Sequence, residues 1–88
     1  MLMDDRLKRL HMRSWRRGMK EMDLILGPWA DANLENLSED TVALYDRLLE
    51  ENDQDLLAWM LGQRPVPEGP LAPLIGEIAV FARKRFKQ

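Results

Sequence analysis

The chain has 88 residues, of which 45% are hydrophobic and 32% charged, with a formal net charge of −2 and a pI of about 5.3. This length supports one small domain, and the acidic balance gives no overall attraction to nucleic acid or anionic lipid. The absence of cysteine excludes disulfides, thiolate metal sites and cysteine nucleophiles. No apolar run is long enough for a membrane span or a secretory signal, so we expect a cytoplasmic protein without direct membrane insertion.

Apolar residues recur at helical spacing along almost the whole chain, and alternation with period two is rare. The pattern predicts an all-α protein, a small five-helix bundle in which residues 1–88 form a single domain. The first helix is expected from about Asp4 to Arg17, with acids near its positive end and arginines near its negative end. Its predicted inward residues are Leu7, Leu10, Ser14 and Trp15.

A second helix is predicted to start near Met19, after Gly18 ends the first. Its apolar period resumes after Gly27-Pro28, although proline inside a helix removes a hydrogen bond and clashes with the preceding turn. We therefore expect a kink or a break at this point rather than the end of the helix. The predicted inward residues are Met22, Ile25, Leu26, Trp29, Asn33, Leu34 and Leu37.

Two shorter helices are predicted next. Ser38 is expected to cap a third helix that ends near Asn52, and Asp53 is expected to cap a fourth helix over residues 54–61. Gly62 stops the fourth helix. The residues expected to be core are Val42, Tyr45, Leu48 and Leu49 in the third helix and Leu56, Leu57 and Trp59 in the fourth.

Residues 63–70 contain three prolines and a glycine, which predict an extended and fairly stiff loop. A fifth helix is expected from about residue 71 to Phe86. Residues 83–88 form a basic C-terminal tail, whose cations suit the negative end of a helix dipole. The inward residues of this helix are expected to be Leu74, Ile75, Ile78, Phe81 and Ala82.

Little in the sequence indicates catalysis. The single histidine, His11, has no serine or cysteine nucleophile spaced to pair with it, and we interpret it as a satisfied or exposed surface histidine. No spacing of ligand residues indicates a metal site, and the scattered glycines form no phosphate-binding loop. We therefore predict no catalytic residue, no metal and no stably bound cofactor.

The stretch RRGMKEMD, residues 16–23, combines two arginines, a glycine and two acids. One interpretation is a joint between helices, in which arginines end one helix, glycine takes the left-handed conformation and acids begin the next helix. The other is a partner-binding surface, because arginine pairs with carboxylates and carbonyls, and glycine lets a second backbone approach closely. The residue types alone leave both interpretations open.

This stretch resembles the signature of the succinate dehydrogenase assembly factors, the small flavinylation factors of the SdhE type. Their pattern is Arg-Gly-x-x-Glu followed by an apolar residue and Asp. The residues that match it are Arg17, Gly18, Glu21 and Asp23. A second stretch, from Leu48 to Trp59, resembles the later helix pair of that family, so the similarity spans nearly the whole chain.

The resemblance implies an assembly chaperone that binds the flavoprotein subunit of succinate dehydrogenase, and in some bacteria that of fumarate reductase. It would promote covalent attachment of FAD to a histidine of that subunit by holding the flavin and the histidine in place. The FAD then belongs to the partner, and the chain itself is not an enzyme. The absence of a transit-like leader favours a bacterial cytoplasmic member, which we expect to be a monomer.

The resemblance also implies a set of partner-binding residues, namely Arg16, Arg17, Gly18, Glu21 and Asp23. The flavoprotein backbone would approach Gly18, with Arg17 and Glu21 as polar anchors and the other two residues at the edge. A side chain at Gly18 is expected to block docking at little cost in folding energy, unless the φ angle there is positive.

Two other functions stay open. A generic protein-interaction module, such as an antitoxin-like protein, would bind a different partner and leave flavin attachment unchanged. A small nucleic-acid binder would use the basic first helix, and it would lose binding when Arg9 and Arg13 become acidic. The acidic net charge argues against nucleic acid as a partner.

Overall fold

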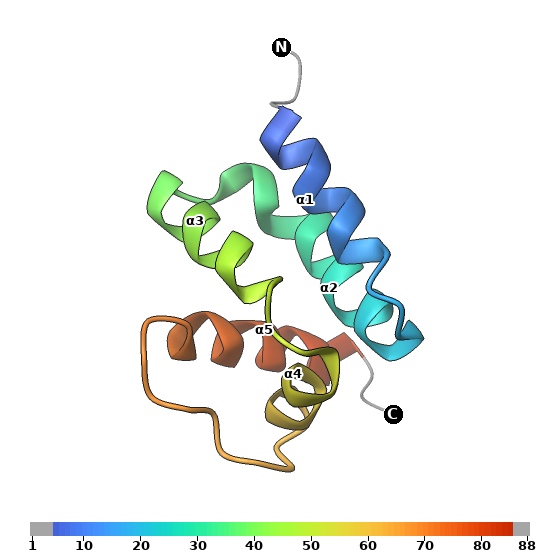
Figure 1. The fold of residues 1–88 in the computed structure, drawn as a ribbon, viewed down its shortest axis with the longest axis vertical. Coiled ribbons are helices and arrows are strands. Elements are labelled where there is room, and N and C mark those ends of the chain that lie inside the picture. Colours follow the sequence, from blue (N-terminus) through green and yellow to red (C-terminus); the bar gives the residue numbers. More distant parts are fainter. Residues whose placement is uncertain (1–4, 86–88) are drawn as a thin grey trace.

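Five α-helices occur in the part of the chain that the computed structural model describes, residues 5–85 (Figure 1). They are α1 (Asp5–Trp15), α2 (Lys20–Asn33), α3 (Glu39–Leu48), α4 (Asp53–Met60) and α5 (Ala72–Arg85), with a short 3-10 helix, η1 (Leu34–Asn36), after α2. No strand is present among these residues, and the predicted all-α five-helix fold is confirmed. The predicted helix ends at Asp4 and Phe86, and residues 86–88 of the basic tail, lie outside the described range.

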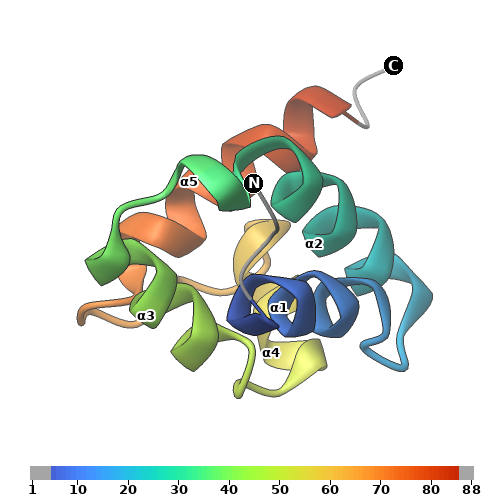
Figure 2. The same cartoon turned by 90° about the horizontal axis from the view of Figure 1, so that it is seen from above.

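The helices pack around α2. Helix α1 runs alongside α2, and η1 turns the chain so that α3 lies on the other side of α1 (Figure 2). Helix α5 crosses beneath α2 and packs against α4, and α4 also contacts α2 (Figure 1). The joint between α1 and α2 consequently lies at the periphery of the molecule, at the end of the α1–α2 pair.

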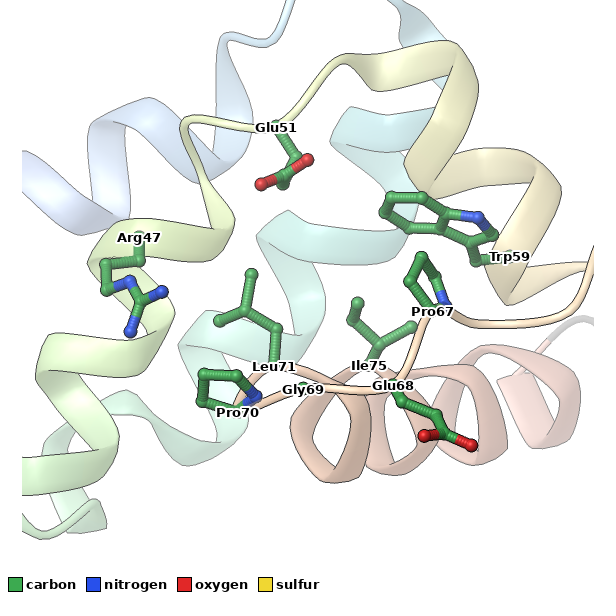
Figure 3. Close-up of a pocket in the computed structure, with 9 residues that line it drawn as sticks. All are labelled: Arg47, Glu51, Trp59, Pro67, Glu68, Gly69, Pro70, Leu71 and Ile75. Carbon is green, nitrogen blue, oxygen red and sulfur yellow. The ribbon is translucent and has the colours of Figure 1, made fainter.

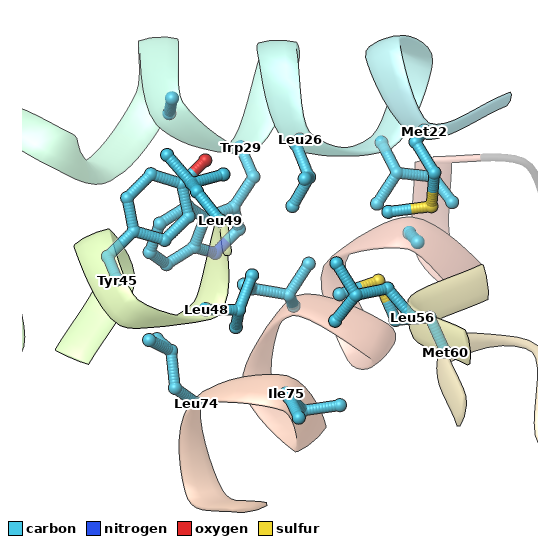
Figure 4. Packing of buried hydrophobic residues seen from close by; sticks show 14 of the residues in the cluster. Met22, Leu26, Trp29, Tyr45, Leu48, Leu49, Leu56, Met60, Leu74 and Ile75 are labelled. Carbon is cyan, nitrogen blue, oxygen red and sulfur yellow. The ribbon is translucent and has the colours of Figure 1, made fainter. Parts of the chain in front are cut away.

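The core lies between α2 and the helices that surround it (Figure 4). At its centre the rings of Trp29 and Tyr45 lie with their centroids 5.0 Å apart and their planes tilted by 37°. Most predicted inward residues are buried: Leu10, Ser14, Met22, Ile25, Leu26, Trp29, Leu34, Val42, Tyr45, Leu48, Leu49, Leu56, Leu74, Ile75, Ile78 and Ala82. Others pack on the edge of the core and are partly buried: Leu7, Leu37, Leu57, Trp59 and Phe81.

Ser14 is a buried polar residue within the apolar stripe of α1, and its hydroxyl is fully satisfied. Its Oγ donates to the Leu10 carbonyl at 2.7 Å, one turn back in the helix. The same oxygen lies 2.5 Å from the hydroxyl of Tyr45, which therefore donates to it. This pair lets a tyrosine enter the core without a costly unpaired hydroxyl.

Helix α4 begins differently from the prediction. Asn52 is its N-cap, accepting from the backbone N–H groups of Gln54 at 2.8 Å and Asp55 at 3.2 Å. Asp53, the predicted cap, is the first helical residue, and its carboxylate pairs with Arg17. Because Asn52 is used as this cap, α3 ends at Leu48, earlier than the predicted end near Asn52. The Ser38 cap of α3 is confirmed, since its side chain accepts from the Thr41 N–H at 3.2 Å.

Helix α2 continues through Pro28, as the resumed apolar period predicted, and the alternative of a break at Gly27-Pro28 is wrong. The missing proline N–H leaves the Leu24 carbonyl without its usual helical donor. Gly27 has a packing role, because the indole of Trp15 lies over it and a Cβ atom at this position would clash with Trp15 Cδ2. Trp15, predicted to face inward, is thus a surface residue that remains 40% exposed.

Candidate functional site

Residues 16–19 form the joint between α1 and α2, where the sequence predicted either a simple connection or a partner-binding surface. Gly18 has a φ angle of +88°, in the left-handed region that residues with side chains rarely adopt. It is exposed, and a Cβ atom built there would meet nothing within 4 Å. The chain therefore requires glycine for its backbone conformation, and the space above Gly18 is open to another molecule.

Arg17 folds back onto its own chain. Its Nε donates to Asp53 Oδ1 at 2.7 Å, and only 10% of its side chain is exposed. Nη1 and Nη2 donate to the carbonyls of Leu49 and Glu51, at 2.5 and 2.9 Å. Those carbonyls follow the end of α3, where a cation is favoured by the helix dipole. One guanidinium thus ties the α1–α2 joint to the α3–α4 corner.

Asp23 completes the internal support of the joint. Its Oδ1 accepts the backbone N–H of Arg17 at 2.7 Å. Met19, the N-cap residue of α2, makes no side-chain hydrogen bond to the helix. The hydrogen bond between Asp23 and the Arg17 N–H instead links the start of α2 to the joint. Both members of the Arg17–Asp23 pair therefore hold the backbone of the joint in one shape.

The five predicted partner-binding residues thus fall into two groups. Arg17 and Asp23 contact other parts of their own chain, while Arg16, Gly18 and Glu21 are exposed. The two interpretations of the stretch are compatible, because the internal pair fixes the joint and the exposed residues are displayed on it. Partner binding by these five residues stays a prediction.

The motif did not predict Leu24 and Leu61, two exposed leucines beside Glu21. A groove between α2 and α4 is lined by Glu21, Leu24, Ile25, Leu57 and Leu61. Leu24 lies outside the inward stripe of α2, so a large apolar residue on the polar side of a helix was the available signal. Leu61 follows the last residue of α4 and lies four positions after Leu57, so the helical spacing of the two leucines was the available signal.

His11 of α1 faces Asp31 of α2, and 19% of its side chain is exposed. Its Nδ1 is 3.3 Å from Asp31 Oδ1, and its Nε2 is buried without a hydrogen-bond partner. Asp31 also accepts from the Trp15 indole N–H at 3.3 Å. Within residues 5–85, no group of three or more histidine, cysteine, aspartate and glutamate side chains is arranged to hold a metal ion.

A pocket lies under the proline-rich loop (Figure 3). Its residues come from α3, α4, the loop and α5: Arg47, Glu51, Trp59, Pro67, Glu68, Gly69, Pro70, Leu71 and Ile75. The single cation, Arg47, is outnumbered by two glutamates, so the pocket does not favour the phosphates of a nucleotide cofactor. The absence of a bound cofactor stays a prediction.

Fold and surface together define a small helical protein that displays a rigid, exposed glycine joint. Comparison with known proteins gives the family. A family model described as the flavinator of succinate dehydrogenase matches residues 8–82, and the chain belongs to that family.

Individual relatives agree with the family match. The FAD assembly factor SdhE of Shewanella oneidensis is 36% identical over 63 residues, covering 72% of this chain and 77% of that protein. That of Legionella pneumophila is 36% identical over 76 residues, covering 86% of this chain and 95% of the relative. The mitochondrial succinate dehydrogenase assembly factor 2 of Dictyostelium discoideum is 41% identical over 61 residues, which is 43% of its length. No solved structure matches the chain.

None of the helices within residues 5–85 has the length and apolar character that crossing a membrane requires. The cytoplasmic location and the monomeric state stay predictions.

Proposed function

We propose that this chain is an assembly factor that binds the flavoprotein subunit of succinate dehydrogenase and promotes covalent attachment of FAD to it. The observation that carries the proposal is the joint at Gly18, where Gly18 and Glu21 of the family pattern Arg-Gly-x-x-Glu are exposed and Arg17 holds the backbone in place. Membership of the flavinator family supports the choice of partner. The flavoprotein subunit of fumarate reductase is a second target of the same chemistry.

The factor acts by orientation and by a shift in the population of partner conformations. Flavin and target histidine both belong to the flavoprotein, and the bond between them forms once they are held at reacting distance. A protein that binds the competent conformation of the flavoprotein more tightly than the others raises its population. This role makes the chain a chaperone rather than an enzyme.

The internal contacts of the joint explain why it suits such a role. Because Arg17 and Asp23 already fix the backbone, little conformational entropy is lost when a partner docks on Gly18. The missing side chain at Gly18 allows the partner backbone to approach, and the exposed Arg16 and Glu21 offer charged groups on either side.

The test is covalent flavin on the cognate flavoprotein subunit, co-expressed with the chain and read as flavin fluorescence in a denaturing gel. Gly18→Arg is expected to abolish the flavin band by steric block. Gly69→Arg is the control, because Gly69 lies in the proline-rich loop outside the α2–α4 groove and also has a positive φ, +149°, and open space at its Cβ position. Both variants place a side chain on a backbone with positive φ, and circular dichroism verifies that both remain folded.

A second variant separates docking from strain altogether. Glu21→Ala alters an exposed residue in a helix where alanine is favourable, so folding is unaffected while the polar anchor is lost. Equal flavin bands for wild type, Gly18→Arg, Glu21→Ala and a culture without the factor would refute the proposed function.

The nucleic-acid alternative receives no support from the structure. Arg6 pairs with Glu39 at 2.9 Å, and Arg13 contacts Asp46 at 2.8 Å and Glu50 at 2.7 Å. These two cations of α1 are thus paired with carboxylates of α3 and of the segment that follows it. No observation favours an antitoxin-like partner over the flavoprotein.

A further inference from the structure

The groove between α2 and α4 is almost entirely apolar. Ile25 forms its floor and is buried, while Leu57 is half-buried along its wall. Leu24 and Leu61 form its rims and remain 39% and 51% exposed. Among residues 5–85, Glu21 is the only charged residue that lines it, and it is the lining residue nearest in sequence to the joint.

Exposed leucines on both sides of one groove are unusual for a surface that contacts only solvent. The large hydrophobic residues exposed within residues 5–85 are Met12, Trp15, Leu24, Leu61 and Val80. Two of them border this groove, and a third, Trp15, lies over Gly27, one turn along α2 from Leu24. Apolar exposure is therefore concentrated along the outer side of α2, which is typical of interaction sites.

The position of Glu21 links the groove to the joint. Glu21 belongs both to the groove lining and to the Arg-Gly-x-x-Glu pattern, and it lies one helical turn from Leu24 and Ile25. A protein that docks on Gly18 and contacts Glu21 consequently extends over the mouth of the groove. The groove and the proposed docking surface therefore share Glu21.

We propose that this groove receives an apolar side chain of the flavoprotein subunit, next to the contact at Gly18. The inference rests on the proposed function and adds a second point of attachment to it. Burial of an aliphatic or aromatic side chain between Leu24 and Leu61 supplies affinity, while the joint supplies position. An apolar pocket beside a polar contact matches the usual anatomy of a protein interface, in which an apolar centre is bordered by polar groups.

The experiment measures the dissociation constant of the complex with the isolated flavoprotein subunit by titration calorimetry. The test variant is the double substitution Leu24→Gln with Leu61→Gln, and the matched control is Val80→Gln. Val80 is 45% exposed on α5, so the control replaces an apolar surface residue outside the groove. The expected result is binding weakened at least about tenfold for the double variant and changed less than about twofold for the control.

Thermal unfolding of all variants verifies that the fold is unchanged, as expected for exposed positions. If Gly18→Arg abolishes binding while the double variant binds like wild type, the groove inference is overturned and the proposed function stands. If the wild-type chain does not bind the flavoprotein subunit, both fail. If sedimentation shows a wild-type dimer that the double variant converts to a monomer without weakening flavoprotein binding, the groove is a self-association site and the inference is wrong.

Discussion

Arg16 and Arg17 are neighbours with identical side chains and opposite roles. Arg17 makes three hydrogen bonds to Leu49, Glu51 and Asp53, whereas Arg16 is exposed. Arg17→Ala removes a largely buried cation and leaves its acceptors, including a carboxylate, unsatisfied. We expect it to lower the free energy of unfolding by about 2–4 kcal/mol. Arg16→Ala is expected to change it by less than about 0.5 kcal/mol.

Urea denaturation of the two variants measures this difference, with equal slopes required for a valid comparison. Arg17→Lys adds a further test, because an ammonium cannot reproduce the planar fork that reaches two carbonyls and a carboxylate. Equal stability of Arg16→Ala and Arg17→Ala would contradict the assigned role of Arg17. The sequence could not separate these arginines, because the partners of Arg17 lie more than 30 positions away along the chain.

Tyr45 makes stability depend on alkaline pH. Burial raises the pKa of its phenol from 10.0 to about 12, against the opposing effects of the Arg17 and Arg13 charges. The unfolded chain loses this proton near pH 10 while the folded chain keeps it, so the contribution is complete below pH 10 and is lost as the pH rises to about 12. Two pKa units correspond to a loss of about 3 kcal/mol.

The chain contains a single tyrosine, so tyrosinate absorbance reports this group alone. The folded protein is expected to titrate well above pH 10, and the unfolded protein near it. Tyr45→Phe is the control for the loss of stability between pH 10 and 12, because lysines titrate over the same range and this variant has no phenol. Ser14 keeps its hydrogen bond to the Leu10 carbonyl in that variant. A folded-state transition at the ordinary tyrosine value would contradict the buried, donating phenol.

At the scale of single elements, apolar periodicity predicted the five helices and most of their buried faces. The periodicity gave wrong predictions where contacts between residues far apart in the sequence determine the local structure. Asn52 and Asp53 are both good caps by residue type, and the choice between them depends on Arg17, which takes the Asp53 carboxylate. Similarly, the residue types of Gly27-Pro28 predict an interruption of the helix, whereas in the structure Gly27 leaves room for the indole of Trp15.

Gly27 and Trp15 are therefore expected to be energetically coupled. In the wild type, Gly27→Ala forces the indole off α2 and weakens its bond to Asp31, which offsets or exceeds the gain in helix propensity. In a Trp15→Ala background the obstacle is gone, and Gly27→Ala should stabilise the protein by up to about 1 kcal/mol. A double-mutant cycle by urea denaturation measures the coupling. Additive effects would show that the contact carries no energy.

At the scale of the whole molecule, the sequence predicted the bundle and the joint. It did not predict which residues of the joint make internal contacts and which are exposed, or that a groove lies beside the joint. Both depend on how α2 lies against α4 and on how the α3–α4 corner reaches back to Arg17. Glu21 alone belongs to the sequence pattern and to the groove. In the proposed complex, residues that are near in sequence would set the position of the partner, and residues that are near only in space would supply affinity.

The charge distribution of the whole molecule predicts how binding depends on salt concentration. Net charge is −2, and Arg6 and Arg13 of α1 face carboxylates of α3. Without a field of one sign, binding to the flavoprotein should vary weakly with salt, and duplex DNA should not bind at about 0.1 M salt. Arg9→Glu, which alters an exposed cation of α1, should leave flavoprotein affinity within about twofold of wild type. Fluorescence anisotropy with labelled DNA and with labelled flavoprotein tests both statements. Steeply salt-dependent DNA binding that Arg9→Glu removes would instead make α1 a phosphate-binding face and return the nucleic-acid function to first place.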